Sequence, residues 1–177
     1  MLLALGGWWV GLGSRVLTRR SSGRLPAAAY LGSLEPLYMP LAQHEIQVGA
    51  VAYFDVTVLN GDPRITQPQY PTTRPSPFVC FEVGQGRSAW AAITTKQRPD
   101  GKRLEIEKAW RLGGSIQWNN DDLFLNDGAC TYVGPDQAFI DAAVAEQAFV
   151  TIPRPGIAAV GITQIITAVQ KRHGNRL

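Results

Sequence analysis

Residues 77–95 read PFVCFEVGQGRSAWAAITT, and this stretch predicts a β-hairpin. The first run, 77–83, is short, apolar and rich in Phe and Val, which is typical of a buried strand. The four residues GQGR at 84–87 predict a tight turn, because glycine tolerates a positive φ without steric cost. The second run, 88–95, is again apolar and predicts the antiparallel partner strand.

The sequence on either side of the hairpin also indicates β-structure. Residues 48–58, VGAVAYFDVTV, alternate and are rich in Val, Tyr and Phe, so they predict a strand. Residues 59–77 contain many Pro, Gly, Asn and Asp residues and predict a long loop. After a Pro-Asp-Gly turn within 96–101, residues 102–109 alternate polar and apolar side chains, as a half-exposed strand does.

The C-terminal third of the chain combines short strands with helices. Two further short strands are expected around 115–118 and 129–133, and 135–149 predicts a helix with proline in its first turn. Residues 157–172 predict a second helix, whose apolar face comprises Ala158, Ile162, Ile165, Ile166 and Val169. The order of elements predicts a mainly β fold with C-terminal helices (α+β), arranged as a small, strongly bent antiparallel sheet or barrel.

The length of 177 residues predicts one domain with additions. Met39 opens MPLAQHEIQVGAVAYF, which is typical of the start of a small domain. We therefore expect 1–38 to be an N-terminal extension outside the fold and 39–177 to form the domain. The apolar run near the N-terminus has no basic residue before it and is shorter than the ~20 residues that span a bilayer. We expect no stable membrane association; a peripheral anchor is the alternative.

The inventory of reactive side chains restricts the chemistry. The only histidines are His44 and His173, and no Cys/His cluster has the spacing of a metal site, so we expect no metal. No phosphate-binding glycine loop is present, and we expect no cofactor. Cys80 and Cys130 lie in apolar or mixed runs, which favours buried free thiols in a reducing, cytoplasmic compartment.

The charge is unevenly distributed along the chain. Residues 64–111 hold nine Lys and Arg against four Asp and Glu, whereas 112–150 hold six acidic residues and no Lys or Arg. A basic segment with interspersed aromatic residues suits a polyanion such as RNA, although a solvated charged face gives the same pattern. The candidate RNA-binding residues are Arg64, Tyr70, Lys96, Arg98, Lys102 and Arg103.

Arginine and hydroxyl groups are the remaining candidates for catalysis. Arg74 lies in TTRPSP, and Thr94 and Thr95 end the apolar run AITT. A guanidinium suits phosphoryl chemistry because it binds phosphate oxygens through charge-assisted, bidentate hydrogen bonds. With RNA the 2′-hydroxyl of the substrate is the nucleophile, so neither a metal nor a protein nucleophile is required. For the two threonines at a strand end, a purely structural role is the alternative.

The segments VGAVAYFDV, RPSPFVCFEV and AAITTKQ, followed by an amphipathic helix, resemble in order and spacing the MazF/PemK toxin family. The resemblance covers roughly residues 48–110, and the terminal helix by type only. Ala50 stands where an acidic residue is common in the family, and the stretch 111–150 is longer than in compact toxins.

The resemblance implies an SH3-like β-barrel and a metal-independent endoribonuclease that cuts single-stranded RNA. It implies that Arg74 is the acid–base and phosphate-stabilising group, and that Thr94, or Thr95 if the register slips, holds the scissile phosphate. It also implies a homodimer, an antitoxin protein as partner, and a loop before Arg74 that covers the RNA channel.

Two other functions remain open from the sequence. One is a catalytically silent SH3-like module that binds protein or nucleic acid, and the other is a membrane-associated structural protein. Trp90 is expected in the core rather than as a base-stacking platform, and Trp118 and Tyr132 are expected in the core or at a dimer contact.

Overall fold

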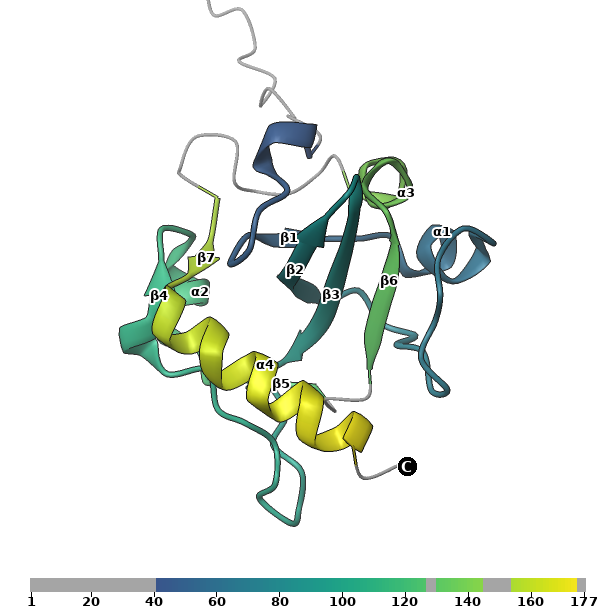
Figure 1. Cartoon of the computed structure of the whole chain (residues 1–177). Helices are drawn as coiled ribbons and strands as arrows, with labels where there is room; N and C mark the ends of the chain where they lie inside the picture. The colour runs from purple at the N-terminus through teal and green to yellow at the C-terminus, as the bar shows by residue number, and fades with distance from the viewer. Residues whose placement is uncertain (1–40, 127–129, 145–153, 175–177) are drawn as a thin grey trace, which may run out of the picture. The chain divides into compact units, whose positions relative to one another are not determined.

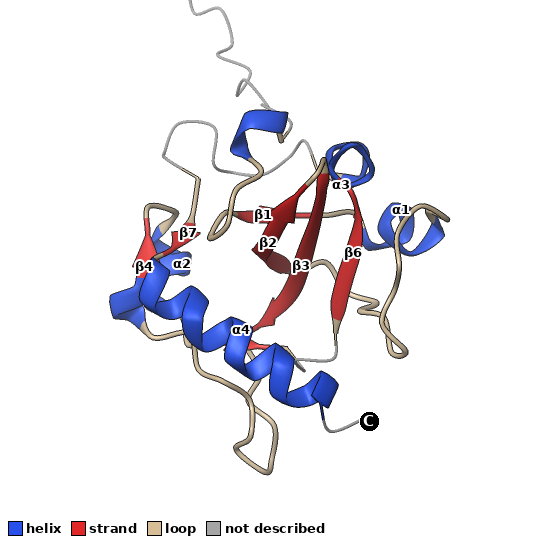
Figure 2. Cartoon of the chain, in the orientation of Figure 1, coloured by secondary structure: helices blue, strands red, loops and turns tan. Residues whose placement is uncertain are grey.

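The computed structural model describes residues 41–126, 130–144 and 154–174. The predicted extension 1–38 and residues 145–149 of the predicted helix lie outside these ranges. Within them the fold is α+β, with antiparallel sheets and a long C-terminal helix (Figures 1 and 2).

The predicted hairpin is confirmed and forms the centre of the main sheet. Strand β2 spans Pro77–Gly84 and pairs antiparallel with β3, Arg87–Thr94. The two turn residues, Gln85 and Gly86, have φ values of 55° and 72°. Two successive positive φ values match the twist of the flanking strands, which is why a glycine is favoured here.

Both edges of β3 are occupied. On one side it pairs with β2, and on the other its first part, Arg87–Ala91, pairs with β6, Thr131–Pro135. The end of β3 pairs instead with β5, Phe124–Leu125. Strand β1, Val51–Tyr53, lies on the far side of β2. Figure 1 shows the resulting sheet, in which β3 is central.

The prediction of one strand over 48–58 is confirmed only for Val51–Tyr53, since residues 48–49 form a turn and the strand ends at Tyr53. The chain turns into helix α1, Val56–Gly61, because Asp55 caps it. The Asp55 carboxylate accepts hydrogen bonds from the backbone N–H groups of Thr57, at 2.8 Å, and Val58, at 3.2 Å. An aspartate at this position stabilises a helix start that the preference of valine and threonine for strands does not favour.

The predictions of strands at 115–118 and 102–109 are also wrong. Helix α2, Ile116–Asn120, begins after Ser115, whose hydroxyl accepts from the Trp118 N–H. In 102–109 only one isolated bridge forms, between Glu105 and Phe124, before the 3-10 helix η2, Lys108–Trp110. The alternation itself is real, since Ile106 is buried between exposed glutamates. Burial thus alternates around Ile106, but residues 102–109 form no strand because, among the described residues, no continuous partner strand lies beside them.

The remaining elements frame the main sheet. They are the 3-10 helix η1 (Gln43–Glu45), helix α3 (Asp136–Ala142), helix α4 (Ala159–Gly174) and a two-stranded sheet of β4 (Arg111–Leu112) with β7 (Gly156–Ile157). The apolar face predicted for the last helix is confirmed, because Ile162, Ile165 and Val169 are buried in one cluster with strand residues. No helix in the described ranges is both long and apolar enough to cross a membrane.

Alternate residues of the strands supply two hydrophobic clusters. Phe78 and Trp90 belong to the first, and their neighbours Val79 and Ala91 belong to the second, so the two clusters cover opposite faces of the sheet. The expectation that Trp90 is a core residue is confirmed: its side chain is fully buried and meets the Phe54 ring edge-on at a centroid distance of 5.0 Å. Trp118 and Tyr132 are buried as well.

Cys80 and Cys130 are both buried and neither forms a disulfide, as the sequence predicts. Cys80 makes stability depend on pH. Burial raises the pKa of the Cys80 thiol to about 12, whereas an unfolded thiol titrates near about 8.5. The unfolded chain therefore loses this proton first as the pH rises. We expect the free energy of unfolding to be unaffected by the Cys80 thiol below pH ~8.5. Above that pH it should fall by up to about 1.4 kcal/mol per pH unit toward pH 12.

Urea denaturation between pH 8 and 11 measures this slope. The variant Cys80→Ala provides the comparison, because tyrosines that titrate in the same range remain in both proteins. If the free energy of unfolding falls equally with pH in the two proteins, the pH dependence does not come from Cys80.

Candidate functional site

A pocket of about 450 Å³ lies where the hairpin begins and ends. One wall is the segment 71–77, which leads into β2, and the other is the end of β3 with the residues that follow it. The polar side chains that line it are Thr72, Thr73, Arg74, Ser76, Thr94, Thr95, Lys96, Arg103 and Asn126.

The hairpin explains why Arg74 and Thr94 meet. In the β2–β3 ladder Phe78 is opposite Ala92, so the residues before β2 lie beside the residues at the end of β3. Arg74, Thr94 and Thr95, which are the predicted catalytic residues, therefore line the same pocket. An antiparallel pair joined by a two-residue turn always brings these two ends to one edge.

The pocket is cationic. Arg74, Lys96 and Arg103 line it, and among the residues that the structure describes no Asp or Glu contributes to the lining. The Arg74 side chain is exposed and forms no hydrogen bond or ion pair within the described ranges. The pocket also contains two buried polar atoms, Ser76 Oγ and Arg103 Nε, that have no hydrogen-bond partner in the part of the chain that the structure describes. Such an arrangement suits an anionic ligand with several oxygen acceptors.

The Thr94 hydroxyl is oriented by the backbone. Thr94 pairs with Phe124 in the β3–β5 ladder, so its Cα is fixed by the sheet. Its Oγ1 accepts a hydrogen bond of 3.2 Å from the Lys96 N–H. Thr95, by contrast, follows the last residue of β3 and is exposed. The structure therefore supports Thr94 as the better-positioned hydroxyl of the pair.

Arg103 reaches the same pocket from the loop after β3. Its Nη1 donates to the Lys96 carbonyl, and its Nη2 donates to Asn126 Oδ1 at 2.9 Å. The Asn126 N–H in turn donates to the Ala92 carbonyl of β3 at 2.7 Å. Both acceptors of the guanidinium are neutral, so its positive charge is not compensated by a carboxylate within the described ranges.

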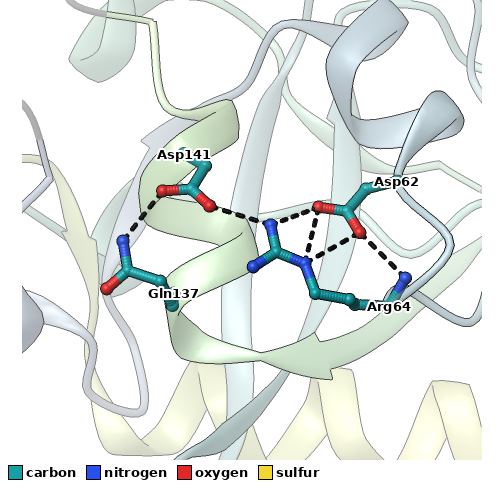
Figure 3. A network of polar contacts seen from close by, with 4 residues as sticks. All are labelled: Asp62, Arg64, Gln137 and Asp141. Atoms are coloured by element: carbon teal, nitrogen blue, oxygen red, sulfur yellow. Dashed lines mark hydrogen bonds and ion pairs between the residues drawn. The ribbon is translucent and has the colours of Figure 1, made fainter.

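Arg64 does not line this pocket. Figure 3 shows its guanidinium between two carboxylates, with Nη2 at 2.6 Å from Asp62 and 2.8 Å from Asp141. Hydrogen bonds from Arg64 hold the pKa values of both carboxyl groups below their usual range. Gln137 adds a hydrogen bond to Asp141. Arg64 thus links the loop after α1 to α3, which leaves its charge satisfied within the fold.

Three other predicted RNA-binding residues lie outside the pocket lining. Tyr70 is 72% exposed and precedes the first lining residue, Pro71. Arg98 and Lys102 flank Asp100, at N–O distances of 3.5 and 3.9 Å. Lys96 and Arg103 are therefore the members of the predicted set that the fold brings to the pocket.

Ser76 and Asn126 were not predicted as site residues. Ser76 is part of the motif TTRPSP, so its proximity to Arg74 could have been found from the sequence. Asn126 carries no such signal, because it reaches the pocket only through the pairing of β5 with β3.

A larger hollow of about 620 Å³ lies between the loop 66–69, the main sheet and α4. Its floor is mostly apolar, with Phe81, Val133 and Ile166, and Glu82 is the only charged side chain among its described lining residues. The part of its lining that the structure describes contains no Lys or Arg, and we assign no chemistry to it.

Neither hollow is arranged for a metal ion. Within the described ranges, no group of three or more His, Cys, Asp or Glu side chains is close enough together to hold one. The Arg74 pocket instead offers guanidinium, ammonium and hydroxyl donors, the set that binds phosphate directly.

No known protein family, curated protein or solved structure matches this chain. What the fold and the pocket define is a class of site: a cationic and hydroxyl-lined pocket at the edge of a small α+β domain, with no carboxylate among the described lining residues.

Proposed function

We propose that this protein is a metal-independent endoribonuclease of the MazF/PemK type, which cleaves single-stranded RNA as the toxin of a toxin–antitoxin pair. The observation that carries the proposal is the meeting of Arg74 and Thr94, from TTRPSP and AITT, in one pocket that Lys96 and Arg103 also line. The bent antiparallel sheet around β3 is compatible with an SH3-like barrel, which we propose as the fold family.

The proposed reaction uses the RNA itself as nucleophile. The 2′-oxygen attacks the adjacent phosphorus, the bond to the 5′-oxygen breaks, and the products carry a 2′,3′-cyclic phosphate and a 5′-hydroxyl. The 2′-hydroxyl releases one proton and the departing 5′-oxygen takes one up, so the proton count balances. Arg74 donates hydrogen bonds to the equatorial oxygens of the phosphorane, and Thr94 donates one from the opposite wall.

The charge of Arg74 fixes its role in this scheme. A guanidinium stays protonated in proteins, so it acts by hydrogen bonding and electrostatic stabilisation of the charge that develops on phosphate. We propose that water carries the two protons. Lys96 adds positive potential at the pocket, where it attracts the RNA backbone.

The same proposal includes the partners and the compartment. The exposed Arg74 segment and the cationic pocket provide a surface that an acidic antitoxin segment would cover, and a homodimer is the assembly that we propose. Two buried cysteines that form no disulfide suit a reducing cytoplasm.

Purified full-length protein, incubated with a single-stranded RNA oligonucleotide in excess EDTA, tests the function. We expect cleavage to continue in EDTA and to yield a 2′,3′-cyclic phosphate end, identified by mass spectrometry. A 2′-deoxy substitution at the cut site should block that cut. Induction of the full chain in bacteria should also arrest growth. Intact RNA together with normal growth would contradict the proposal.

The second candidate is a non-catalytic SH3-like module that binds RNA or another anionic partner at the same pocket. It is favoured because the described lining residues include no His, Asp or Glu, and thus no conventional general base. The same incubation separates the two functions: a binding module retains the oligonucleotide on a filter without shortening it.

A further inference from the structure

The turn that follows β3 is held by a chain of hydrogen bonds, and this chain ends on the Thr94 hydroxyl. We infer that Arg103 is a positioning residue, which fixes this turn so that Thr94 donates its hydroxyl proton into the pocket. The inference rests on the proposed function for its kinetic consequence, but the hydrogen-bond chain can be tested without any RNA.

The first step is the bond between Lys96 and Thr94. Because Thr94 Oγ1 accepts from the Lys96 N–H at 3.2 Å, one of its lone pairs is occupied. The hydroxyl proton then points away from that amide and remains available to an acceptor. A phosphate oxygen in the pocket is such an acceptor, since Thr94 and Arg74 line the same space.

The second step is the bond that holds Lys96 from its other side. Arg103 Nη1 donates to the Lys96 carbonyl, so both backbone polar groups of Lys96 are engaged. Arg103 Nη2 donates to Asn126, whose own N–H donates to the Ala92 carbonyl of β3. The chain of bonds therefore starts on β3 and returns to β3 two residues later, at Thr94.

The third step is the anchoring of Arg103 itself. The Gln97 side chain accepts from the Arg103 N–H at 3.3 Å and donates to the Arg103 carbonyl at 3.4 Å. The loop between Gln97 and Arg103 is thereby closed at its base. Arg103 binds the Lys96 carbonyl and Asn126 from its two terminal nitrogens, a geometry that the single nitrogen of a lysine does not reproduce.

The substitution Arg103→Lys separates geometry from charge. It keeps the positive charge at the pocket and removes the fork, so a purely electrostatic role predicts nearly unchanged cleavage. We expect instead that kcat falls about 10- to 100-fold while KM changes less than about threefold, as is usual when a reacting group is misplaced by a fraction of an ångström. Arg87→Lys, at the opposite end of the hairpin, is the matched control and should leave both constants unchanged.

A double-mutant cycle identifies Thr94 as the group through which Arg103 acts. Thr94→Val removes the hydroxyl with little change in shape. If the inference holds, Arg103→Lys adds no more than about a twofold loss in the Thr94→Val background, because coupled residues are not additive. Independent, multiplicative losses would overturn it, and so would full activity of Arg103→Lys alone.

The last experiment tests the hydrogen-bond chain without measuring RNA cleavage. Hydrogen exchange by NMR should show a Lys96 amide that exchanges at least about 10-fold faster in Arg103→Lys and in Thr94→Val than in the wild type. Titration with inorganic phosphate should shift the Thr94 and Lys96 amide signals, with weaker binding in Arg103→Lys. Unchanged exchange of Lys96 would overturn the positioning role, whereas failure of the wild type to cut RNA with these shifts intact would overturn only the proposed function.

Discussion

Replacing Arg74 with alanine is expected to lower the rate of RNA cleavage about 1,000-fold, the usual cost of removing one donor aimed at a developing anion. Arg74 is exposed and unpaired within the described ranges, so its loss leaves no buried group unsatisfied. We expect single-turnover measurements with the RNA oligonucleotide to place most of the loss in kcat. Arg74→Lys should recover about 10-fold, because a point charge replaces the bidentate fork.

Arg87→Ala is the matched control for this variant. Arg87 is also an exposed arginine, but it lies at the turn end of the hairpin, away from the pocket. The control should cleave at the wild-type rate, and all variants should unfold at the wild-type temperature. If Arg74→Ala keeps more than about a tenth of the activity, another group stabilises the phosphorane and the assignment of Arg74 is wrong.

Replacing Trp90 with alanine is expected to lower the free energy of unfolding by about 3–5 kcal/mol, the range for a fully buried large aromatic side chain. The Trp90 ring packs edge-on against Phe54, and its Nε1 donates to the Ser88 hydroxyl at 2.9 Å. The variant leaves a cavity and also removes the partner of Ser88, which is itself 3% exposed. Urea denaturation at neutral pH measures the change.

Ile116→Ala provides the comparison, because its side chain is 77% exposed and its loss should change stability by less than about 0.5 kcal/mol. Trp90→Phe should fall between the two, since it keeps most of the packing but not the N–H group. A loss below about 1 kcal/mol for Trp90→Ala would mean that the core around Phe54 closes over the cavity.

Short-range patterns predicted the hairpin and the last helix, because both depend on neighbours in the sequence. The turn GQGR and the spacing of Ile162, Ile165 and Val169 contain the necessary information. The caps at Asp55 and Ser115 were missed for the opposite reason: one hydrogen-bonding side chain outweighs the strand preference of the residues that follow. Residues 102–109 alternate correctly but meet only a short partner.

The site was predictable to the extent that the hairpin was. Arg74 and Thr94 meet because one turn joins their strands, and the turn sets the register up to a shift between Cys80 and Glu82, which the sequence pattern did not indicate. Asn126 and the fork of Arg103 depend on β5, which reaches β3 from 30 residues further along the chain. The pairing of Arg64 with Asp141 spans 77 residues and has no local signal at all. Arg64 therefore counts toward the basic segment 64–111 in the sequence, although Asp62 and Asp141 neutralise its charge in the fold.

Strand β3 pairs with β6 along its first part and with β5 at its end, and this pairing limits where the sequence of the protein can change. Thr94 stands on a strand with both edges occupied, whereas Arg74 stands on an exposed segment outside the regular elements. The segment 67–71 lies between the Thr66–Val133 bridge and the Thr72 N–H, which donates to Tyr132 Oη. Insertions there leave the ladder of the sheet intact, and surface loops tolerate them at small entropic cost. Sequence changes in this loop can therefore alter which ligands enter the pocket, while the position of the Thr94 hydroxyl at the end of β3 stays the same.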